Sequence, residues 1–356
     1  MPSRMAIVAD SGQLASDKMR QVRQGELVKA EAFDVISFDS CGVPFDGWTP
    51  TLSGLGGSES QDIIVLESLA KCGLRVLSIN RLVSQAIVNG VTYLPMAQLA
   101  DKIKTKALIL QRASALPENI EAERLFVRAH DVYSEWSGYN VHDPLFTDGN
   151  LKPTLLCVSE WQRKGYPSHW PSMVVYNSIP DWVYDDGTKG TRNSPSLSFF
   201  YASAAIKGLE PTLRFFQDMK TLKAFRGATL DVCCPGYSAP DGIEIDGVRY
   251  LGSLTFPKLI AQYQKHRNLL HISTFKECCP LAHIMSEILG QNTFFLATQG
   301  EDGTSEVVNS KLVTENQLTF NANLKRLTDD PQLLKPVEPK DFRASTMVKK
   351  WLEILK

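Results

Sequence analysis

Four short segments of the sequence combine glycine, histidine, lysine or carboxylate side chains in patterns suited to chemistry on a bound anion or sugar. The first is Ser53–Ser60 (SGLGGSES), in which three glycines precede a candidate helix that begins near Ser58. Glycine lets a backbone approach a ligand closely, and a helix N-terminus offers unpaired N–H groups. The alternative is a loop in which Ser58 only caps the helix.

The second segment is Phe126–Asp131 (FVRAHD), an apolar run that ends in His130 and Asp131. The pair would stand at the carboxyl end of a strand, where open α/β sheets place their ligand contacts. An imidazole beside a carboxylate can be oriented toward a hydroxyl or a leaving group. A structural histidine bonded to the local backbone explains the same residues equally well.

The third segment is Phe199–Leu209 (FFYASAAIKGL), whose pattern predicts a strand that ends near Ser203 and a helix opened by Lys207 and Gly208. A lysine at such a crossover, beside a glycine that allows close packing, is suited to neutralising a diphosphate. A solvated lysine next to a helix cap is the alternative interpretation.

The fourth segment is Ile272–Gly290 (ISTFKECCPLAHIMSEILG), in which Glu277 precedes Pro280. Proline is favoured at the first position of a helix, so a helix is predicted to start there. The free N–H groups around Leu281–His283 would then point at an anion, while Glu277 could accept hydrogen bonds from sugar hydroxyls. A lone carboxylate in such a loop is more often a helix cap.

The elements that must position these residues alternate between short apolar runs and amphipathic stretches, which predicts an α/β fold with mostly parallel sheets. In the first half, strands are predicted at Phe33–Phe38, Leu74–Asn80, Ala107–Gln111, Leu125–Arg128, Thr154–Val158 and Met173–Tyr176, and helices at Ser58–Cys72, Met96–Lys102 and Glu160–Lys164. The polar stretch Asp181–Ser196 predicts an interdomain linker. In the second half, strands are predicted at Leu197–Ser203, Thr229–Cys233, Val248–Leu251, Leu269–Ser273 and Thr293–Ala297, and helices at Glu210–Met219, Phe256–Lys265, Pro280–Leu289 and Thr346–Leu355.

Composition bounds the class of protein. The 356 residues, 43% hydrophobic and 22% charged, fit two globular domains of about 150–180 residues each. A formal net charge of -1 provides no global field for nucleic acid or an anionic membrane, so a bound anion must be held locally. No stretch approaches the roughly 20 apolar residues of a membrane span, and the first residues lack the apolar run of a signal peptide. Seven cysteines, four of them in adjacent pairs, fit neither zinc spacing nor a disulfide framework, which indicates reduced thiols in a cytoplasmic setting.

Taken in order, the segments resemble the family-four retaining glycosyltransferases of GT-B fold over nearly the whole chain. SGLGGSE is similar to the glycine-rich acceptor-side loop of that family, and ALILQR followed by FVRAHD resembles the inner strands of its N-terminal domain. CVSEWQR and VVYNSIPD resemble the crossing into the C-terminal domain. YASAAIKGLEPTLRFF resembles the donor-phosphate segment, and ECCPLAHIMSEILGQNT resembles the region of the E-x7-E signature.

The resemblance implies two Rossmann-like domains that face a cleft. Residues 1–180 would form the acceptor-side domain, 181–196 the linker, 197–335 the nucleotide-sugar domain and 336–356 a helix that returns to the first domain. The implied reaction moves a hexose-type sugar, with retention, from a nucleotide-diphosphate sugar to a glycan or other hydroxyl acceptor. Neither a metal nor another cofactor is expected, nucleic acid is not an expected partner, and peripheral membrane contact is left open.

The resemblance also assigns roles to single residues. Lys207 would stabilise the leaving diphosphate, Glu277 would hold the sugar by its hydroxyls, and His130 would lie near the sugar from the N-terminal side. Contacts with the donor and its phosphates are expected from Gly57, Ser58, Ser203, Lys207, Gly208, Pro280, Leu281 and Ala282. The acceptor side is expected to include Gly56, Glu59 and Asp131.

Two positions depart from the family's pattern. Ala202 stands where an arginine often precedes the lysine by five residues. Met285, not a second glutamate, stands eight residues after Glu277, although Gly290 keeps the family's glycine in register. Glu287 lies two residues further, about 200° around a helix, so the carboxylate that commonly holds the donor ribose in the family is expected to be missing.

Three other interpretations are compatible with the sequence. The missing carboxylate fits a non-catalytic GT-B module that binds a nucleotide sugar or a partner protein. Hydrolysis or epimerisation of a sugar nucleotide on the same fold is another, because a fold does not fix a reaction. A metal-dependent GT-A transferase would need an Asp-x-Asp motif at a strand end, whereas the acidic pairs at 185–186, 244/246 and 329–330 lie in polar stretches that indicate solvated loops.

Overall fold

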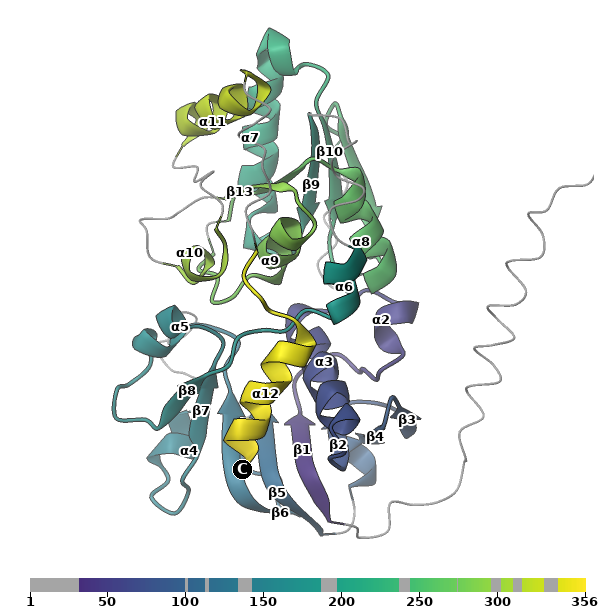
Figure 1. The fold of residues 1–356 in the computed structure, drawn as a ribbon, viewed down its shortest axis with the longest axis vertical. Coiled ribbons are helices and arrows are strands. Elements are labelled where there is room, and N and C mark those ends of the chain that lie inside the picture. Colours follow the sequence, from purple (N-terminus) through teal and green to yellow (C-terminus); the bar gives the residue numbers. More distant parts are fainter. Residues whose placement is uncertain are drawn as a thin grey trace, which may run out of the picture.

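Two β-sheets, one in each half of the chain, carry the fold (Figure 1). The computed structural model describes residues 32–99, 102–112, 115–133, 143–186, 197–236, 244–273, 275–295, 302–309, 316–329 and 339–356. Within these described ranges the first sheet has eight strands and the second has five, so the predicted α/β class with mostly parallel sheets is confirmed.

The first sheet has the order β3-β4-β2-β1-β5-β6-β7-β8, and all neighbours are parallel except β3 and β4. Its central strands are nearly continuous apolar runs, which is typical of strands covered on both faces. Its strands are β1 (Phe33–Asp39), β2 (Val76–Asn80), β3 (Ala86–Val88), β4 (Val91–Pro95), β5 (Ile103–Gln111), β6 (Ile120–Arg128), β7 (Thr154–Cys157) and β8 (Ser172–Val174). Its helices are α2 (Thr49–Leu52), α3 (Gly57–Lys71), α4 (Asp143–Thr147), α5 (Glu160–Gly165) and α12 (Ala344–Leu355).

The second sheet is parallel throughout, in the order β11-β10-β9-β12-β13. Its strands are β9 (Ser198–Ala202), β10 (Thr229–Cys233), β11 (Val248–Gly252), β12 (Asn268–His271) and β13 (Asn292–Phe295). The surrounding helices are α6 (Asp181–Asp186), α7 (Leu209–Thr221), α8 (Phe256–Lys265), α9 (Leu281–Ile288), α10 (Thr304–Val307) and α11 (Gln317–Asp329). Apolar residues of α7 and α11 share one core cluster, and those of α8 and α9 share the other, so each pair covers its own face of the sheet.

One sequence prediction about an element was wrong, and another stretch contains a helix that was not predicted. The helix predicted at Met96–Lys102 is a single 3-10 turn at Met96–Gln98 that follows β4, and residues 100 and 101 lie outside the described residues. The stretch predicted as a polar linker begins with α6 (DWVYDD), because Asp181 favours the first helical turn and Val183 is fully buried. The acidic pair 185–186 therefore ends a helix, and residues 187–196 lie outside the described residues.

The chain crosses between the two sheets twice, and the two crossings run side by side. The Ile179 N–H donates to the Phe342 carbonyl at 2.8 Å, and the Ala344 N–H donates to the Ile179 carbonyl at 2.9 Å. After the second crossing, α12 (yellow in Figure 1) packs against α3 on the first sheet. Trp351 of α12 is 1% exposed within the core cluster that α3 also supplies, so the last helix completes the N-terminal core.

Glu306 of α10 joins the two halves of the chain beside this crossing. Its Oε1 accepts from the Glu160 N–H at 2.8 Å and from Tyr176 Oη at 2.5 Å, and its Oε2 accepts from the Trp161 N–H at 2.7 Å. A carboxylate of the C-terminal half thus caps the first turn of α5 in the N-terminal half. Negative charge at a helix N-terminus is stabilising because it satisfies N–H groups that have no partner within the helix.

We expect Glu306→Ala to lower the free energy of unfolding by about 1–2 kcal/mol, the usual cost of losing a helix cap. Urea unfolding followed by circular dichroism measures it. Glu353→Ala, which removes an exposed carboxylate of α12, is the matched control and should change stability by less than about 0.5 kcal/mol. Equal losses in the two variants would contradict the capping role of Glu306.

Candidate active site

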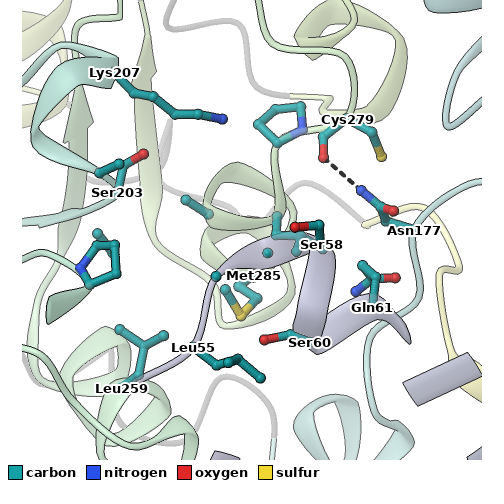
Figure 2. A pocket seen from close by; sticks show the side chains of 18 of the residues that line it. Leu55, Ser58, Ser60, Gln61, Asn177, Ser203, Lys207, Leu259, Cys279 and Met285 are labelled. Carbon is teal, nitrogen blue, oxygen red and sulfur yellow. Dashed lines mark hydrogen bonds between the residues drawn. The ribbon is translucent and has the colours of Figure 1, made fainter. Parts of the chain in front are cut away.

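A cavity of about 360 Å³ lies between the two halves of the chain. The N-terminal half lines it with the glycine turn, the start of α3 and the residues just after β6. The C-terminal half lines it with residues that follow β9, β10 and β12. In Figure 2, Ser58, Ser60 and Gln61 of α3 lie across the cavity from Lys207. Carboxyl ends of strands from both sheets therefore meet at one site, as expected for ligand binding in open α/β sheets.

Lys207 and Glu277 form an ion pair in this cavity, with Lys207 Nζ 3.1 Å from Glu277 Oε2. The Lys207 side chain is 33% exposed and the Glu277 side chain is 10% exposed. Burial alone would lower the pKa of Lys207, but the charge of Glu277 and its hydrogen bond outweigh this, so the pKa lies above its ordinary value. The ammonium group therefore stays charged at neutral pH.

Two helix N-termini face the cavity from opposite sides. Helix α9 begins at Leu281 after Pro280, and α3 begins at Gly57 after Gly56; neither helix start has a side-chain cap. A Cβ atom built on Gly57 would lie 3.3 Å from Leu281 Cδ1, so the two helix starts approach closely. Free N–H groups at helix starts favour anions, which makes the cavity that both helix starts line suited to a phosphate group.

The cavity brings together most of the residues that the sequence singled out. Those that line it are Gly56, Gly57, Ser58, His130, Asp131, Ser203, Lys207, Glu277, Pro280, Leu281 and Ala282. Details of the helix starts differ from expectation, because Pro280 precedes the first helical residue and Ser58 does not cap α3. The Ser58 hydroxyl instead donates to Glu59 Oε2 at 2.9 Å.

Glu59 and Gly208 were expected at the cavity and do not line it. Residues 57, 60, 61 and 64 form the face of α3 that lines the cavity, and Glu59 points away from that face toward Arg112, whose Nη2 lies 2.9 Å from Glu59 Oε1. Gly208 has φ +118°, and a Cβ atom there would lie 2.3 Å from the Ile272 carbonyl oxygen. Gly208 therefore allows close packing of the chain behind Lys207.

Met285 lines the cavity, as Figure 2 shows, whereas Glu287 does not. Glu287 is buried on another side of α9, where its Oε2 accepts a hydrogen bond from the Asn309 N–H at 2.9 Å. The expectation that Glu287 turns away from the site agrees with this geometry. The family's second carboxylate is therefore absent from this position of the cavity, and the thioether of Met285 lies there instead.

Several cavity residues were missed by sequence reasoning. Arg112 follows β5 with φ 50°, which is unusual for a residue other than glycine, and its Nη2 also pairs with Asp39. Asn177 Nδ2 donates to the Cys279 carbonyl at 3.1 Å across the two halves (Figure 2). Four cysteine thiols also line the cavity, and burial raises the pKa of all four: Cys233, Cys234, Cys278 and Cys279. These thiols are protonated at neutral pH and are poor nucleophiles.

His271 and His283 stack behind the Lys207–Glu277 pair, with ring centroids 4.8 Å apart. Among the described residues, neither ring nitrogen of His283 has a hydrogen-bond partner. Burial, reinforced by His271 and Lys207, holds the pKa of His283 well below its ordinary value. The unfolded chain therefore binds more protons at this site as the pH falls below about 6.5, and stability is lost with that fall.

We expect His283→Leu to reduce the acid sensitivity of the fold. One proton taken up by only the unfolded chain costs at most about 1.4 kcal/mol of stability for each pH unit below 6.5, and the leucine removes that contribution. Urea unfolding at pH 7, 6 and 5 measures the slope. His169→Leu, at an exposed position, should keep the wild-type slope, and an unchanged slope in His283→Leu would contradict the role of the buried imidazole.

The described residues contain no group of three or more His, Cys, Asp or Glu side chains arranged to hold a metal ion. Within the same residues, no helix is long and apolar enough to cross a bilayer.

Comparisons with known proteins place the fold. No protein-family model and no curated protein matches the sequence. The structure of Anabaena HepE in complex with UDP and glucose superposes with a TM-score of 0.64 at 13% identity, over 91% of this chain and 99% of that chain. The glycosyltransferase from Rickettsia africae ESF-5 gives 0.60 at 11% identity, over 91% and 98%. The chain has the GT-B fold.

A third GT-B structure, sucrose-phosphate synthase from Thermosynechococcus elongatus, gives a TM-score of 0.58 at 12% identity, over 90% of this chain and 96% of that chain. The predicted GT-B arrangement of two Rossmann-like domains facing a cleft is thereby confirmed. At these identities the likeness concerns the fold. The chemistry of the cleft depends on the side chains that this chain places there, because a fold does not fix a reaction.

Proposed function

We propose that the chain is a retaining glycosyltransferase of the cytoplasm that needs no metal ion. It moves a hexose-type sugar from a nucleoside-diphosphate sugar to a glycan or other hydroxyl acceptor. The observation that carries the proposal is the ion pair between Lys207 and Glu277, because Glu277 lies in the loop that leads into the N-terminus of α9. Lys207 and the first N–H groups of α9 supply positive charge where a diphosphate would leave, the role that a divalent cation plays in other transferases.

The two members of the pair divide the donor between them. The Lys207 ammonium faces the diphosphate, and Glu277 Oε1 accepts hydrogen bonds from hydroxyls of the transferred sugar while Oε2 holds the lysine. His130 and the start of α3 approach from the other domain, where the acceptor binds. Solved GT-B structures support a nucleotide donor, because the HepE structure holds UDP and glucose.

Retention is proposed to follow a front-face path. The bond between the anomeric carbon and the diphosphate oxygen breaks, the acceptor oxygen bonds to that carbon on the same face, and the departing phosphate oxygen takes the proton of the acceptor hydroxyl. No covalent enzyme intermediate is required. The protonated cavity thiols and the lysine-paired Glu277 agree with the absence of such a nucleophile.

A non-catalytic GT-B module is the second candidate, and Met285 favours it. A thioether cannot accept the two ribose hydroxyl hydrogen bonds that a carboxylate accepts, so the donor would be held less firmly. Binding without turnover is the outcome that this candidate predicts.

A thermal-shift screen in EDTA, with UDP, GDP, ADP, CDP and dTDP and their common sugars, tests the donor site. We expect one nucleotide to raise the Tm, because a ligand that binds only the folded state stabilises it. Release of that nucleotide from its sugar only when an acceptor is added supports transfer, and release without acceptor indicates hydrolysis. Stabilisation without release favours the binding module. No shift with any nucleotide contradicts a metal-independent donor site.

A further inference from the structure

A row of buried polar side chains connects the cavity to the interior of the N-terminal domain. It starts at His130 after β6, continues through Gln111 at the end of β5, and ends at Asp62 of α3 and Ser37 of β1. Gln111, Asp62 and Ser37 are each at most 2% exposed. Strand β5 lies between β1 and β6, so the sheet itself holds these elements side by side.

Each hydrogen bond between His130, Gln111 and Asp62 has its donor on the side nearer the cavity, and the Asp62 carboxylate at the buried end fixes this order. Ser37 Oγ donates to both Asp62 oxygens at 2.9 Å, and Gln111 Nε2 lies 2.9 Å from Asp62 Oδ1. An ionised carboxylate can only accept, so the amide nitrogen of Gln111 faces Asp62 and its Oε1 faces His130. Because Oε1 also can only accept, His130 Nε2, at 2.8 Å, carries a proton.

We propose that Gln111 and Asp62 are positioning residues that hold neutral His130 as its Nε2–H tautomer. The lone pair of the ring then lies on Nδ1, so that nitrogen can only accept hydrogen bonds. The tautomer follows from the row of hydrogen bonds alone. Its effect on sugar transfer rests on the proposed function.

The direction of the row depends on the ionisation of Asp62. Burial raises the pKa of Asp62 to about 7, Arg128 and Arg112 oppose that rise, and Asp39 adds to it. Tyr93, whose pKa the charge of Asp62 also helps to raise, stays neutral because burial raises that pKa well above the ordinary value. Above pH 7 the carboxylate is therefore ionised and can only accept hydrogen bonds, which fixes the direction of the row.

Histidine ¹⁵N NMR on the intact chain at pH 8.5 tests the proposal without any assay of transfer. Ring nitrogens with and without a proton have distinct ¹⁵N shifts, and the loss of one signal set in His130→Asn assigns His130. We expect predominantly the Nε2–H tautomer in the wild type. Gln111→Met, which keeps the size but not the hydrogen bonds, should give a mixture, whereas Gln98→Met at an exposed position should change nothing.

Asp62→Asn is the second variant, because its amide can donate to Gln111 Oε1 and reverse the row, which moves the His130 proton to Nδ1. If one of the two variants fails to fold, the tautomer of His130 in the other is enough to test the proposal. A wild-type His130 protonated on Nδ1, or a tautomer ratio that neither variant changes, overturns the proposal.

Kinetics then separate this inference from the proposed function. Gln111→Met is expected to lower kcat roughly tenfold, with little change in the KM for the donor, as for other residues that orient a reacting group. A shifted tautomer with an unchanged kcat overturns the catalytic consequence. A wild type that transfers no sugar but shows the Nε2–H tautomer contradicts the proposed function alone.

Discussion

Replacing Lys207 by Ala is expected to lower kcat by about 10²–10³-fold, the usual cost of removing one group that stabilises developing negative charge in a buried site. Lys207 Nζ lies 3.1 Å from Glu277 Oε2 and beside the start of α9, where the proposed diphosphate leaves. The substitution also removes the counter-charge of Glu277, a carboxylate that is 10% exposed, so the remaining negative charge would repel the donor. Nucleotide binding and turnover should therefore both fall.

Initial rates at saturating donor, together with nucleotide-induced Tm shifts, measure the two effects. Lys223→Ala, at an exposed position of the same domain, is the matched control and should keep wild-type values of both. The Tm without nucleotide shows whether Lys207→Ala still folds. A folded Lys207→Ala protein with a wild-type kcat would remove the electrostatic role from which the donor site is argued.

The sequence patterns predicted the parallel strands well because these strands are buried and apolar, but they missed the hairpin of β3 and β4. That hairpin carries a signal that could have found it. Asn89 and Gly90 lie between the two strands with φ 49° and 84°, and Asn-Gly is a frequent pair in two-residue hairpin turns. No strand was predicted at Val91–Pro95, and the next predicted element was the helix at Met96–Lys102.

Helix α11 was missed for a different reason. Its sequence, QLTFNANLKRLTD, is mostly polar, and its link to the core comes from Phe320 and Leu324, four residues apart on one face. Phe320, Leu324 and Leu327 have the i, i+4, i+7 spacing of a helix face, so the sequence held a helix signal that was overlooked among the polar residues. The contact with α7 is what gives that face its buried environment.

Residues at strand ends and at helix starts were placed at the site, and Glu59 and Gly208 were the exceptions. His130 and Lys207 follow strands, and the carboxyl ends of parallel strands meet at one edge of a sheet whatever the rest of the fold does. Glu59 depended on where α3 begins, and it faces Arg112 because the helix starts at Gly57. Arg112 directly follows the predicted strand that ends at Gln111, so the same strand-end reasoning could have placed it at the cavity.

Trp351→Ala is expected to lower the free energy of unfolding by about 3–5 kcal/mol, the range for removing a large buried aromatic side chain. Trp351 is 1% exposed on α12, and its ring lies 5.4 Å from the guanidinium carbon of Arg128. Arg128 is buried in turn and helps to keep Asp62 ionised. The loss of Trp351 would therefore leave a cavity and would also admit water to a buried charge.

The effect of Trp351→Ala should reach the active site, because α12 follows the second crossing, where Ile179 and Phe342 are hydrogen-bonded. Ile179 also lines the cavity, so loosening α12 from α3 weakens the support of that wall. We expect a lower midpoint in urea unfolding together with weaker nucleotide binding. Lys349→Ala, on the exposed face of α12, should change stability by less than about 0.5 kcal/mol. Wild-type stability in Trp351→Ala would mean that α12 adds nothing to the N-terminal core. Lost stability together with wild-type nucleotide binding would mean that loosening α12 does not affect the cavity wall at Ile179.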